Sequence, residues 1–471
     1  CNCKFLRWTS PRLWAVSVSA FRIPPELEAA MRKNVVAFFN NPDNLCFPPE
    51  YAAKFRPTGE VELHSLRESL MALQSLVRYR KDSWAAEQGH RMLETVWKIS
   101  GPDASWDLEK LEAYRRLRKQ AHRHLDPTGS NGRMIEALLW FYQDTGDPLA
   151  MTLADRFARY HLANSTHADG TFNRSSRPDH SHSYLGTLRG LLLFGEVTNQ
   201  REYIDHVAAT YRKTVLGTLI KQSGYIAHDL STEGIAEPSS VGDIVQLGLS
   251  LSRHGYPEFL DVADRLVRCR LLPCQITQVP GLKPHGDYEG DEVRDIAGRT
   301  VGAYGGMHQP QWAKRPITDI TCAVLHSMVD VYRNIAVRTA AGLTVNFHFT
   351  YQDPNLRITN TRGRDASVTI ELSRRENLLV RIPRWTPPDS VRISVNGSPV
   401  DFKSIGDFAY ISREVLPGKI VLQYALPLHT EVEETAGVKY TFGWKGDEIV
   451  GVTPNSDFFP FYPTLSNEEK P

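Results

Sequence analysis

The sequence lacks the features that mark several common classes of protein. Its 471 residues contain only 6 cysteines, too scattered for the disulfide framework of a small secreted domain. No run of about 18 apolar residues occurs, so no segment is predicted to span a membrane. Lys and Arg number 55 against 54 Asp and Glu, and no block of like charge stands out. This balance argues against a nucleic-acid partner.

Motifs of nucleotide-dependent enzymes and serine hydrolases are missing as well. No Rossmann or P-loop glycine string and no G-x-S-x-G string stands between a predicted strand and a helix. The pair of cysteines in "CRLLPC" has no second pair to complete a zinc set. Aromatic residues, in contrast, are plentiful, with 9 Trp and 18 Tyr. Aromatic rings suit a carbohydrate cleft, although packing of an ordinary core accounts for them more simply.

A helical hairpin recurs through the first two thirds of the chain. Each copy combines a short polar turn with a helix that has apolar residues at i, i+3, i+4 and i+7. The copies follow each other at intervals of roughly 53 to 66 residues, and each is preceded by another helical run. They begin at Tyr79, Thr145, Thr198 and His254. Such hairpins must stack to bury their apolar faces, and the long loops between them indicate a closed (α/α)6 barrel with loops at one mouth.

The hydrophobic period changes from 3.6 to two near residue 340. Strings such as "GLTVNFHFT", "ASVTIELSR" and "KIVLQYALPL" alternate apolar and polar residues. They predict an all-β sandwich to about residue 431, followed by one or two strands and an aromatic-rich end that packs back on the barrel. The predicted fold class is therefore mainly α with an all-β carboxyl-terminal domain, an (α/α)6 toroid followed by an antiparallel β-sandwich. The predicted domains are an N-terminal extension (1–21), the barrel (22–338) and the sandwich (339–471).

This layout resembles the enzymes of glycoside hydrolase family 127, which include the non-reducing-end β-L-arabinofuranosidases. The likeness is strongest in "GLTVNFHFT", "LLVRIPRW", "VRISVNGSPV" and "GDFAYISREVLPGKIVLQYALPL". The relatives have a Gly-Leu-Tyr-Val-Asn-Leu-Tyr type strand, an Arg-Ile-Pro-x-Trp strand and a Val-Asn-Gly hairpin in the same order. The layout covers most of the chain, whereas these strings lie mainly in residues 320–425 and identify the fold better than the chemistry.

The resemblance implies a zinc site from which this sequence departs. In the family, one glutamate and three cysteines hold the metal, and one thiolate is the nucleophile of a retaining hydrolysis. Glu237 in "AEPSS" matches the glutamate and Cys322 in "DITC" matches one cysteine, but Ser239 and Thr321 stand in the other two places. Hydroxyl groups are poor zinc ligands at neutral pH, so we expect no bound metal and no other cofactor. Thr321 and Cys322 are then expected to contact substrate, and a small core residue is the alternative for Cys322.

Catalysis by carboxyl groups is the first expectation in place of the thiolate. A glycosidase needs a protonated acid at the leaving oxygen and a carboxylate as nucleophile or base. The segment "SGYIAHDLSTEGIAEPSS" offers Glu237 with Asp229 or Glu233 as this pair, and His228 as a further titratable group. The alternative enzyme is a uronic-acid lyase or dehydratase in which Tyr225 or His228 is the base. A charged surface loop is the alternative without catalysis.

Further residues are expected to bind the sugar. His180 and His182 precede a helix in "RPDHSHSYLGTLRG", where the resemblance implies a His that contacts sugar. Two His residues two apart also suit a metal fragment, but no third ligand is evident from spacing. Tyr225, and His308 and Trp312 from a long loop, complete the predicted contacts, with a solvated loop as the alternative.

The sequence thus predicts a glycoside hydrolase-like enzyme that acts on the non-reducing end of an oligosaccharide. A non-catalytic glycan-binding relative is the alternative, favoured by intact aromatic residues without a competent acid pair. The oligomeric state stays open, as does a cytoplasmic or exported location, since the start of the chain only faintly resembles a signal peptide. If the family register holds, the side chains of Glu237 and Cys322 lie within about 8 Å, and His182 faces the same cavity.

Overall fold

The computed structural model describes residues 63–101, 103–105, 128–173, 180–230, 232–275, 302, 304, 308–312, 321–457 and 459–466. The chain divides into two compact units. The first unit comprises Cys1–Ile220 and Ile226–Asp243, and the second comprises Lys221–Tyr225 and Ile244–Pro471. The predicted N-terminal extension and the helix expected at 22–41 lie outside the described residues.

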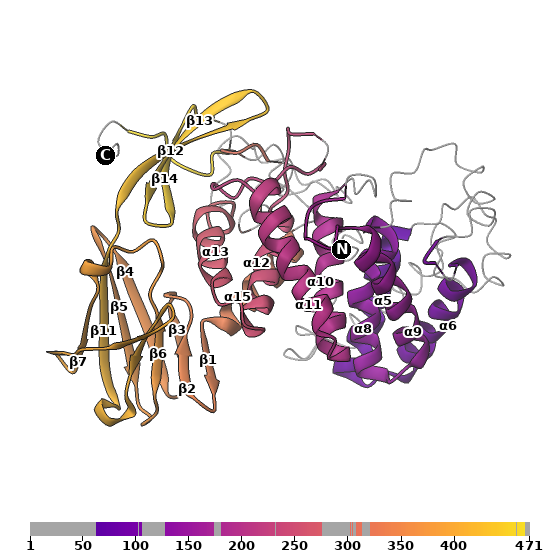
Figure 1. The fold of residues 1–471 in the computed structure, drawn as a ribbon, viewed down its shortest axis with the longest axis horizontal. Helices are drawn as coiled ribbons and strands as arrows, with labels where there is room; N and C mark the ends of the chain where they lie inside the picture. Colours follow the sequence, from indigo (N-terminus) through magenta and orange to yellow (C-terminus); the bar gives the residue numbers. More distant parts are fainter. Residues whose placement is uncertain are drawn as a thin grey trace, which may run out of the picture. The chain divides into compact units, whose positions relative to one another are not determined.

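The first unit consists of helices arranged in successive pairs (Figure 1). The pairs are α5 (Leu63–Arg80) with α6 (Ser83–Ile99), α8 (Arg133–Thr145) with α9 (Pro148–Asn164), and α10 (Ser181–Thr198) with α11 (Arg201–Thr210). The π-helical segments η2 (Thr128–Gly132) and η4 (Tyr211–Leu219) precede α8 and continue α11. Helix α8 packs against α5, α9 and α10, and α10 packs against α11. These pairs coincide with the repeats predicted from the 3.6-residue period.

The turns between paired helices follow from local capping chemistry. Gly146 ends α8 at a φ of 73°, in the left-handed region that favours glycine. Asp147 then caps α9 by accepting a hydrogen bond from the Leu149 amide at 2.9 Å, and Pro148 occupies the first turn. Asp82 caps α6 in the same way. Short linkers are therefore enough to reverse the chain between helices.

Helix α10 is buried without a break from Ser181 to Leu192. Gly190 permits this, because a Cβ atom there would lie 2.8 Å from Cβ of Ile135 in α8. A helix enclosed on most sides by other helices has little freedom to move. It therefore gives firm support to His180, which precedes its first turn, and to His182 within that turn.

The second unit contains the end of α12 (Pro238–Arg253), then α13 (Phe259–Leu266), η5 (Val267–Leu271) and α15 (Thr321–Asn334), followed by the strands. One sheet has the order β1-β2-β6-β10-β9, with β1 (Ala336–Thr339), β2 (Gly342–Val345), β6 (Leu378–Arg381), β10 (Phe408–Ile411) and β9 (Lys403–Ile405). The other has the order β3-β4-β5-β11-β7-β8, with β3 (Tyr351–Asp353), β4 (Leu356–Arg362), β5 (Asp365–Leu372), β11 (Gly418–Ala425), β7 (Arg392–Val395) and β8 (Ser398–Pro399). Strands β2 and β6 run parallel, and the other paired strands of the described residues are antiparallel.

A third sheet follows these two sheets. It has the order β12-β13-β14, with β12 (Leu428–Thr435), β13 (Val438–Lys445) and β14 (Glu448–Thr453). The sequence predicted strands in this tail but not their separation into a sheet of their own. The aromatic-rich end packs on helical residues of the same unit, as predicted, since the Tyr462 hydroxyl donates to the carbonyl of Cys269 in η5 at 2.7 Å.

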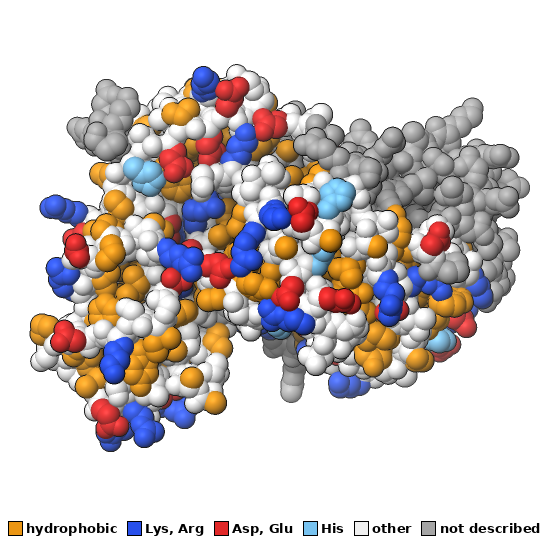
Figure 2. All heavy atoms as spheres, in the orientation of Figure 1, with side chains coloured by type: hydrophobic (Ala, Val, Ile, Leu, Met, Phe, Trp, Pro, Cys, Tyr) orange, Lys and Arg blue, Asp and Glu red, His pale blue; other side chains and the backbone are white. Residues whose placement is uncertain are grey.

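The change from helix to strand falls between Asn334 and Ala336, close to the predicted position. In the described residues before α15, extended pairing is limited to isolated bridges, and no parallel sheet is present. The predicted domain boundaries remain a prediction. None of the described helices combines the length and apolar character needed to cross a bilayer. Figure 2 shows Lys and Arg intermixed with Asp and Glu on the visible face, in keeping with the balanced composition.

Candidate functional site

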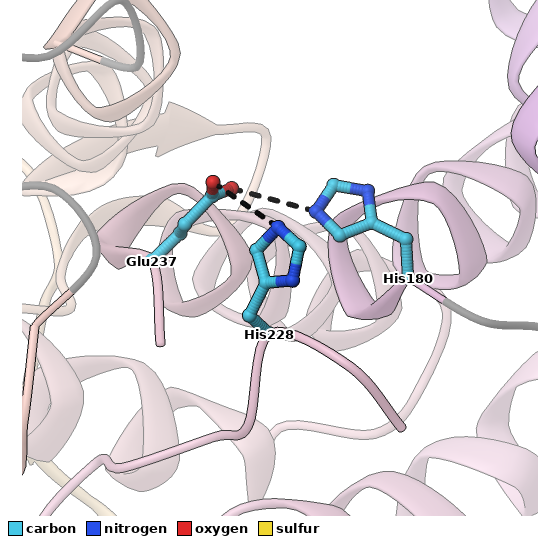
Figure 3. Close-up of side chains that lie close together, drawn as sticks. All are labelled: His180, His228 and Glu237. Carbon is cyan, nitrogen blue, oxygen red and sulfur yellow. Dashed lines mark ion pairs between the residues drawn. The ribbon is translucent and has the colours of Figure 1, made fainter. Parts of the chain in front are cut away.

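Three side chains of the first unit converge from separate segments (Figure 3). His180 precedes α10, His228 lies in the loop after η4, and Glu237 directly precedes α12. Nε2 of His180 lies 3.5 Å from Oε2 of Glu237, and Nε2 of His228 lies 3.5 Å from Oε1. The side chains of His180, His228 and Glu237 are 19%, 17% and 13% exposed, so the group is mostly buried and partly accessible to solvent. We refer to these residues as the His–His–Glu cluster.

Backbone hydrogen bonds hold the three segments in place. The amide of Ser181 donates to the carbonyl of His228 at 2.9 Å, which ties the start of α10 to the loop. The amide of His228 donates to the carbonyl of Ile235 at 2.7 Å, and this closes the loop just before Glu237. The hydroxyl groups of Ser181 and Ser240 lie 2.7 Å apart and join the starts of α10 and α12. The cluster therefore rests on a frame of secondary structure and closed turns.

The imidazole rings are oriented by bonds from their other nitrogen atoms. Nδ1 of His228 donates to Oδ1 of Asp229 at 2.7 Å, because an ionised carboxylate can only accept. Nδ1 of His180 lies 3.1 Å from Oγ of Ser183. The two ring centroids are 4.4 Å apart. Both Nε2 atoms are thereby directed at the carboxylate of Glu237.

The carboxyl group of Glu237 is held in its ionised form. Burial raises its pKa, but the hydrogen bond and charge interaction with His180 and the smaller interactions with His228 and His182 lower it, and the result is about 2. Glu237 is therefore an anion throughout the neutral pH range. It fits a carboxylate that stabilises charge, acts as a base or binds a cation, and it does not fit the proton donor of a glycosidase.

A second set of charged side chains lies behind the cluster and is buried. Nδ1 of His182 lies 2.5 Å from Asp243, whose other oxygen accepts from Arg189 at 2.7 Å, and Arg189 also donates to Glu136 at 2.5 Å. We call Glu136, Arg189, Asp243 and His182 the inner ion chain. Burial lowers the pKa of His182 more than Asp243 raises it, so the ring is neutral at neutral pH. Burial raises the pKa of Asp243, but His182 and Arg189 outweigh this and keep the carboxyl ionised.

The structure brings together several residues that the sequence singled out. His180, His228 and Glu237 form the cluster, Asp229 bonds to His228, and the ring of His182 lies 6.0 Å from that of His180. Glu233 is exposed in the same loop. The catalytic and binding roles given to these residues remain predictions.

The other predicted sugar contacts lie in the second unit. Tyr225 and His308 are 1% and 0% exposed, with ring centroids 6.4 Å apart, and His308 also packs against Phe461. Trp312 is half-buried and pairs through its backbone with Pro460. Thr321 and Cys322 begin α15, but their side chains lie outside the described residues, as does the predicted approach of Cys322 to Glu237.

Sequence reasoning missed Glu136, Arg189 and Asp243. Each is the one charged residue within a largely apolar helical run: "MIEALLWF", "TLRGLLLF" and "VGDIVQL". A charge on the apolar face of a helix needs a buried partner of opposite sign, so these interruptions were the available signal. Which charges pair with one another depends on how the helices pack.

Comparison with solved structures identifies the fold. A β-arabinofuranosidase of glycoside hydrolase family 127 aligns with a TM-score of 0.59 at 12% identity, over 95% of this chain and 74% of that chain. The family 127 β-L-arabinofuranosidase from Geobacillus stearothermophilus T6 aligns with a TM-score of 0.54 at 13% identity, over 94% and 75%. A protein described as a glycoside hydrolase aligns with a TM-score of 0.55 at 11% identity, over 95% and 77%.

These identities establish the fold alone. The chain has the fold of the family 127 enzymes, and the predicted fold class, mainly α with an all-β carboxyl-terminal part, is confirmed. No protein-family profile matches the sequence, and no curated protein does.

Of the places that the family resemblance assigns to zinc ligands, the structure describes the side chains of Glu237 and Ser239. Ser239 occupies the place of a thiolate, and its buried hydroxyl donates to Oε2 of Glu237 at 3.3 Å. The Ser239 hydroxyl is therefore a hydrogen-bond donor to Glu237. The family resemblance implies a metal-binding thiolate at this place. The loss of the sulfur-rich site stays a prediction.

Proposed function

We propose that this protein is a carbohydrate-active enzyme that hydrolyses the glycosidic bond at the non-reducing end of an oligosaccharide. The observation that carries the proposal is the His–His–Glu cluster, a carboxylate between two imidazole rings in a partly open site. The fold shared with family 127 enzymes supports it, as does the β-arabinofuranosidase activity of those proteins. Polar groups that converge in an enclosed site are the usual form of a sugar-processing centre.

Glu237 supplies the negative charge in this mechanism. Glycoside hydrolysis passes through an oxocarbenium-ion-like transition state, and an ionised carboxylate beside the anomeric carbon stabilises it. The hydroxyl of Ser239 and the two imidazole rings fix the position of this carboxylate. A preorganised charge needs little rearrangement during the reaction, which is why its position matters as much as its sign.

The proton for the leaving oxygen comes from a different carboxyl group. Asp229 and Glu233 are the candidates on the same loop, and both are more exposed than Glu237. After the glycosidic bond breaks, water attacks the anomeric carbon and its proton returns to the carboxylate that acted as acid. The imidazole rings of His180 and His228 line the site at which the terminal sugar binds.

Elimination on a uronic acid is the second candidate. The pair formed by His228 and Asp229 favours it, because a carboxylate that accepts from Nδ1 orients an imidazole as a general base. A lyase would release an unsaturated sugar, whereas a hydrolase releases a saturated one. The product therefore separates the two reactions.

The test measures rates on a panel of aryl furanosides, aryl pyranosides and uronides with wild-type protein and three variants. We expect Glu237→Gln to lower the rate roughly 100-fold or more, as loss of a positioned catalytic carboxylate does. Cys322→Ser should cost far less, and Glu202→Gln, an exposed carboxylate on α11, should change nothing. A Glu237→Gln enzyme as active as wild type would refute the proposal. Saturable glycan binding by folded wild-type protein without turnover would replace it with a binding function.

A further inference from the structure

The three polar atoms of the His–His–Glu cluster have the spacing of metal ligands. One donor atom from each of His180, His228 and Glu237 lies within 4.8 Å of the other two. Ligands about 2.1 Å from a tetrahedral zinc ion are about 3.4 Å from one another. Nε2 of His180 lies 3.5 Å from Oε2 of Glu237 and Nε2 of His228 lies 3.5 Å from Oε1, both close to this value. Among the described residues, no other group of three His, Cys, Asp or Glu side chains converges in this way.

The orientation of the polar atoms in the cluster also suits a bound cation. Because Nδ1 of His228 faces Asp229, Nε2 is the ring atom that faces the carboxylate of Glu237, 3.5 Å from Oε1. Nε2 of His180 is buried and, apart from its 3.5 Å contact with Oε2 of Glu237, makes no hydrogen bond among the described residues. Buried polar atoms without a partner often mark the place of a bound water or ion. A cation that all three atoms contact satisfies them together.

Each of the three side chains is held by an outer hydrogen bond. His228 is held by Asp229, and Glu237 by the hydroxyl of Ser239. His180 lies beside the hydroxyl of Ser183. Outer partners of this kind fix the ring tautomer and orientation in metal sites, and a carboxylate on the far nitrogen of a histidine is the most familiar of them.

We propose that His180, His228 and Glu237 bind one divalent transition-metal ion, with zinc as the first choice. The inference deepens the proposed function, because the metal would occupy the same centre and contact the sugar in place of the bare side chains. Two imidazoles and a carboxylate suit zinc and its neighbours and disfavour magnesium and calcium, which prefer oxygen ligands. Three protein ligands also leave a coordination position for water or a sugar hydroxyl, as in catalytic zinc sites.

This site differs from the one that the sequence led us to discount. The expectation of no metal rested on the loss of cysteines from the sulfur-rich site of the family. His180 and His228 come from different loops, so spacing in the sequence does not place their imidazoles together. Only Glu237 is common to both ligand sets.

The test is metal binding by the full-length chain, measured without substrate. Protein freed of metal with a chelator is titrated with Zn²⁺ by calorimetry and with Co²⁺ by its visible absorption, with Mg²⁺ as the negative probe. We expect one ion per chain. His228→Ala should weaken binding roughly 100-fold or more, and Asp229→Asn roughly 10- to 100-fold, because it removes an outer partner. His90→Ala is the matched control, since His90 is half exposed beside Asp147 and Glu94 and should not affect binding.

The possible outcomes test metal binding separately from hydrolysis of glycosides. Stoichiometric binding that is lost in His228→Ala supports the inference, even if no glycoside is hydrolysed. Absence of stoichiometric binding to the wild type overturns it, even if chelated protein hydrolyses glycosides at full rate. Binding that is equal in wild type and His228→Ala also overturns it. His228→Gln, which keeps a polar side chain, replaces His228→Ala if circular dichroism shows that the alanine variant is unfolded.

Discussion

Each of the two units buries a set of charged side chains. The two sets differ in which residues lie beside their last members. In the first unit, the inner ion chain runs from Glu136 through Arg189 and Asp243 to His182, beside the partly open His–His–Glu cluster. In the second unit, arginines of the strands and η5 pair with acidic residues of α13 and the β13–β14 turn. We call this group the sheet network; its members are Asp261, Asp264, Arg268, Arg362, Arg381 and Asp447.

The sheet network joins secondary structure elements, and most of its ion pairs are buried between its own members. Asp264 in α13 accepts from Arg268 at 2.8 Å and also pairs with Arg381 at the end of β6. Arg268 lies 4.1 Å from the ring centroid of Phe349. These charges pair with one another and with aromatic faces. The inner ion chain, in contrast, ends at residues that face a partly open site. Buried charge by itself therefore does not indicate function, since both units contain it; the two sets differ in that the inner ion chain lies beside a partly open cluster.

The largest effect is expected in the sheet network. Asp264→Ala leaves Arg268 and Arg381 buried without their shared carboxylate, so we expect it to lower the free energy of unfolding by about 3 to 5 kcal/mol. Glu414→Ala is the control, because Glu414 and its partner Arg375 are both exposed, and the expected loss is about 0 to 1 kcal/mol. Urea unfolding measures both. Equal losses would show that the sheet network is no more stabilising than a surface pair.

The next effect concerns the inner ion chain. Asp243→Asn removes the charge that holds Arg189 and His182, so we expect glycosidase activity to fall about 10- to 100-fold through misplacement of the cluster. The free energy of unfolding should fall by about 1 to 3 kcal/mol at the same time. Asp264→Ala should change stability without changing the turnover of folded protein.

Rescue distinguishes positioning from a general loss of stability. Asp243→Glu retains the charge and should recover part of the activity lost in Asp243→Asn. If the two Asp243 variants have equal turnover after correction for folded fraction, the inner ion chain has no part in positioning the cluster.

The smallest effect is a dependence of stability on pH. Burial lowers the pKa of His348, in the second unit, to about 3, whereas an unfolded histidine titrates near 6.5. The unfolded chain binds more protons between these values, so stability from this residue is complete above pH 6.5 and is lost as pH falls toward 3. The slope is at most about 1.4 kcal/mol per pH unit.

His348→Gln isolates this contribution. Burial raises the pKa of Asp447 to about 6, and this opposes the slope of His348 between pH 6 and 4 because the folded state then binds the extra proton. Subtracting the curve of stability against pH of His348→Gln from that of the wild type removes the contribution of Asp447, which both proteins share. Urea unfolding at several pH values should show a flatter loss of stability in the variant. Parallel curves would contradict the assignment.

The amino-acid sequence alone determined the fold. The 3.6-residue period, the Gly-Asp-Pro turn before α9 and the change of period near residue 340 are local properties of the chain, and the structure confirms the fold class that they predict. Residue chemistry also selected His180, His228 and Glu237 as candidates. It did not show that these three belong together and that His182 belongs to a different group.

Tertiary structure decided those pairings, for a physical reason. Residues two apart at the start of a helix point in different directions, so His180 faces Glu237 while His182 turns toward Asp243. Tyr225 and His308 have the residue types of sugar contacts, yet packing in the second unit buries both rings. Local pattern fixes the period and ends of each element, whereas contacts between distant residues arise only when those elements pack together.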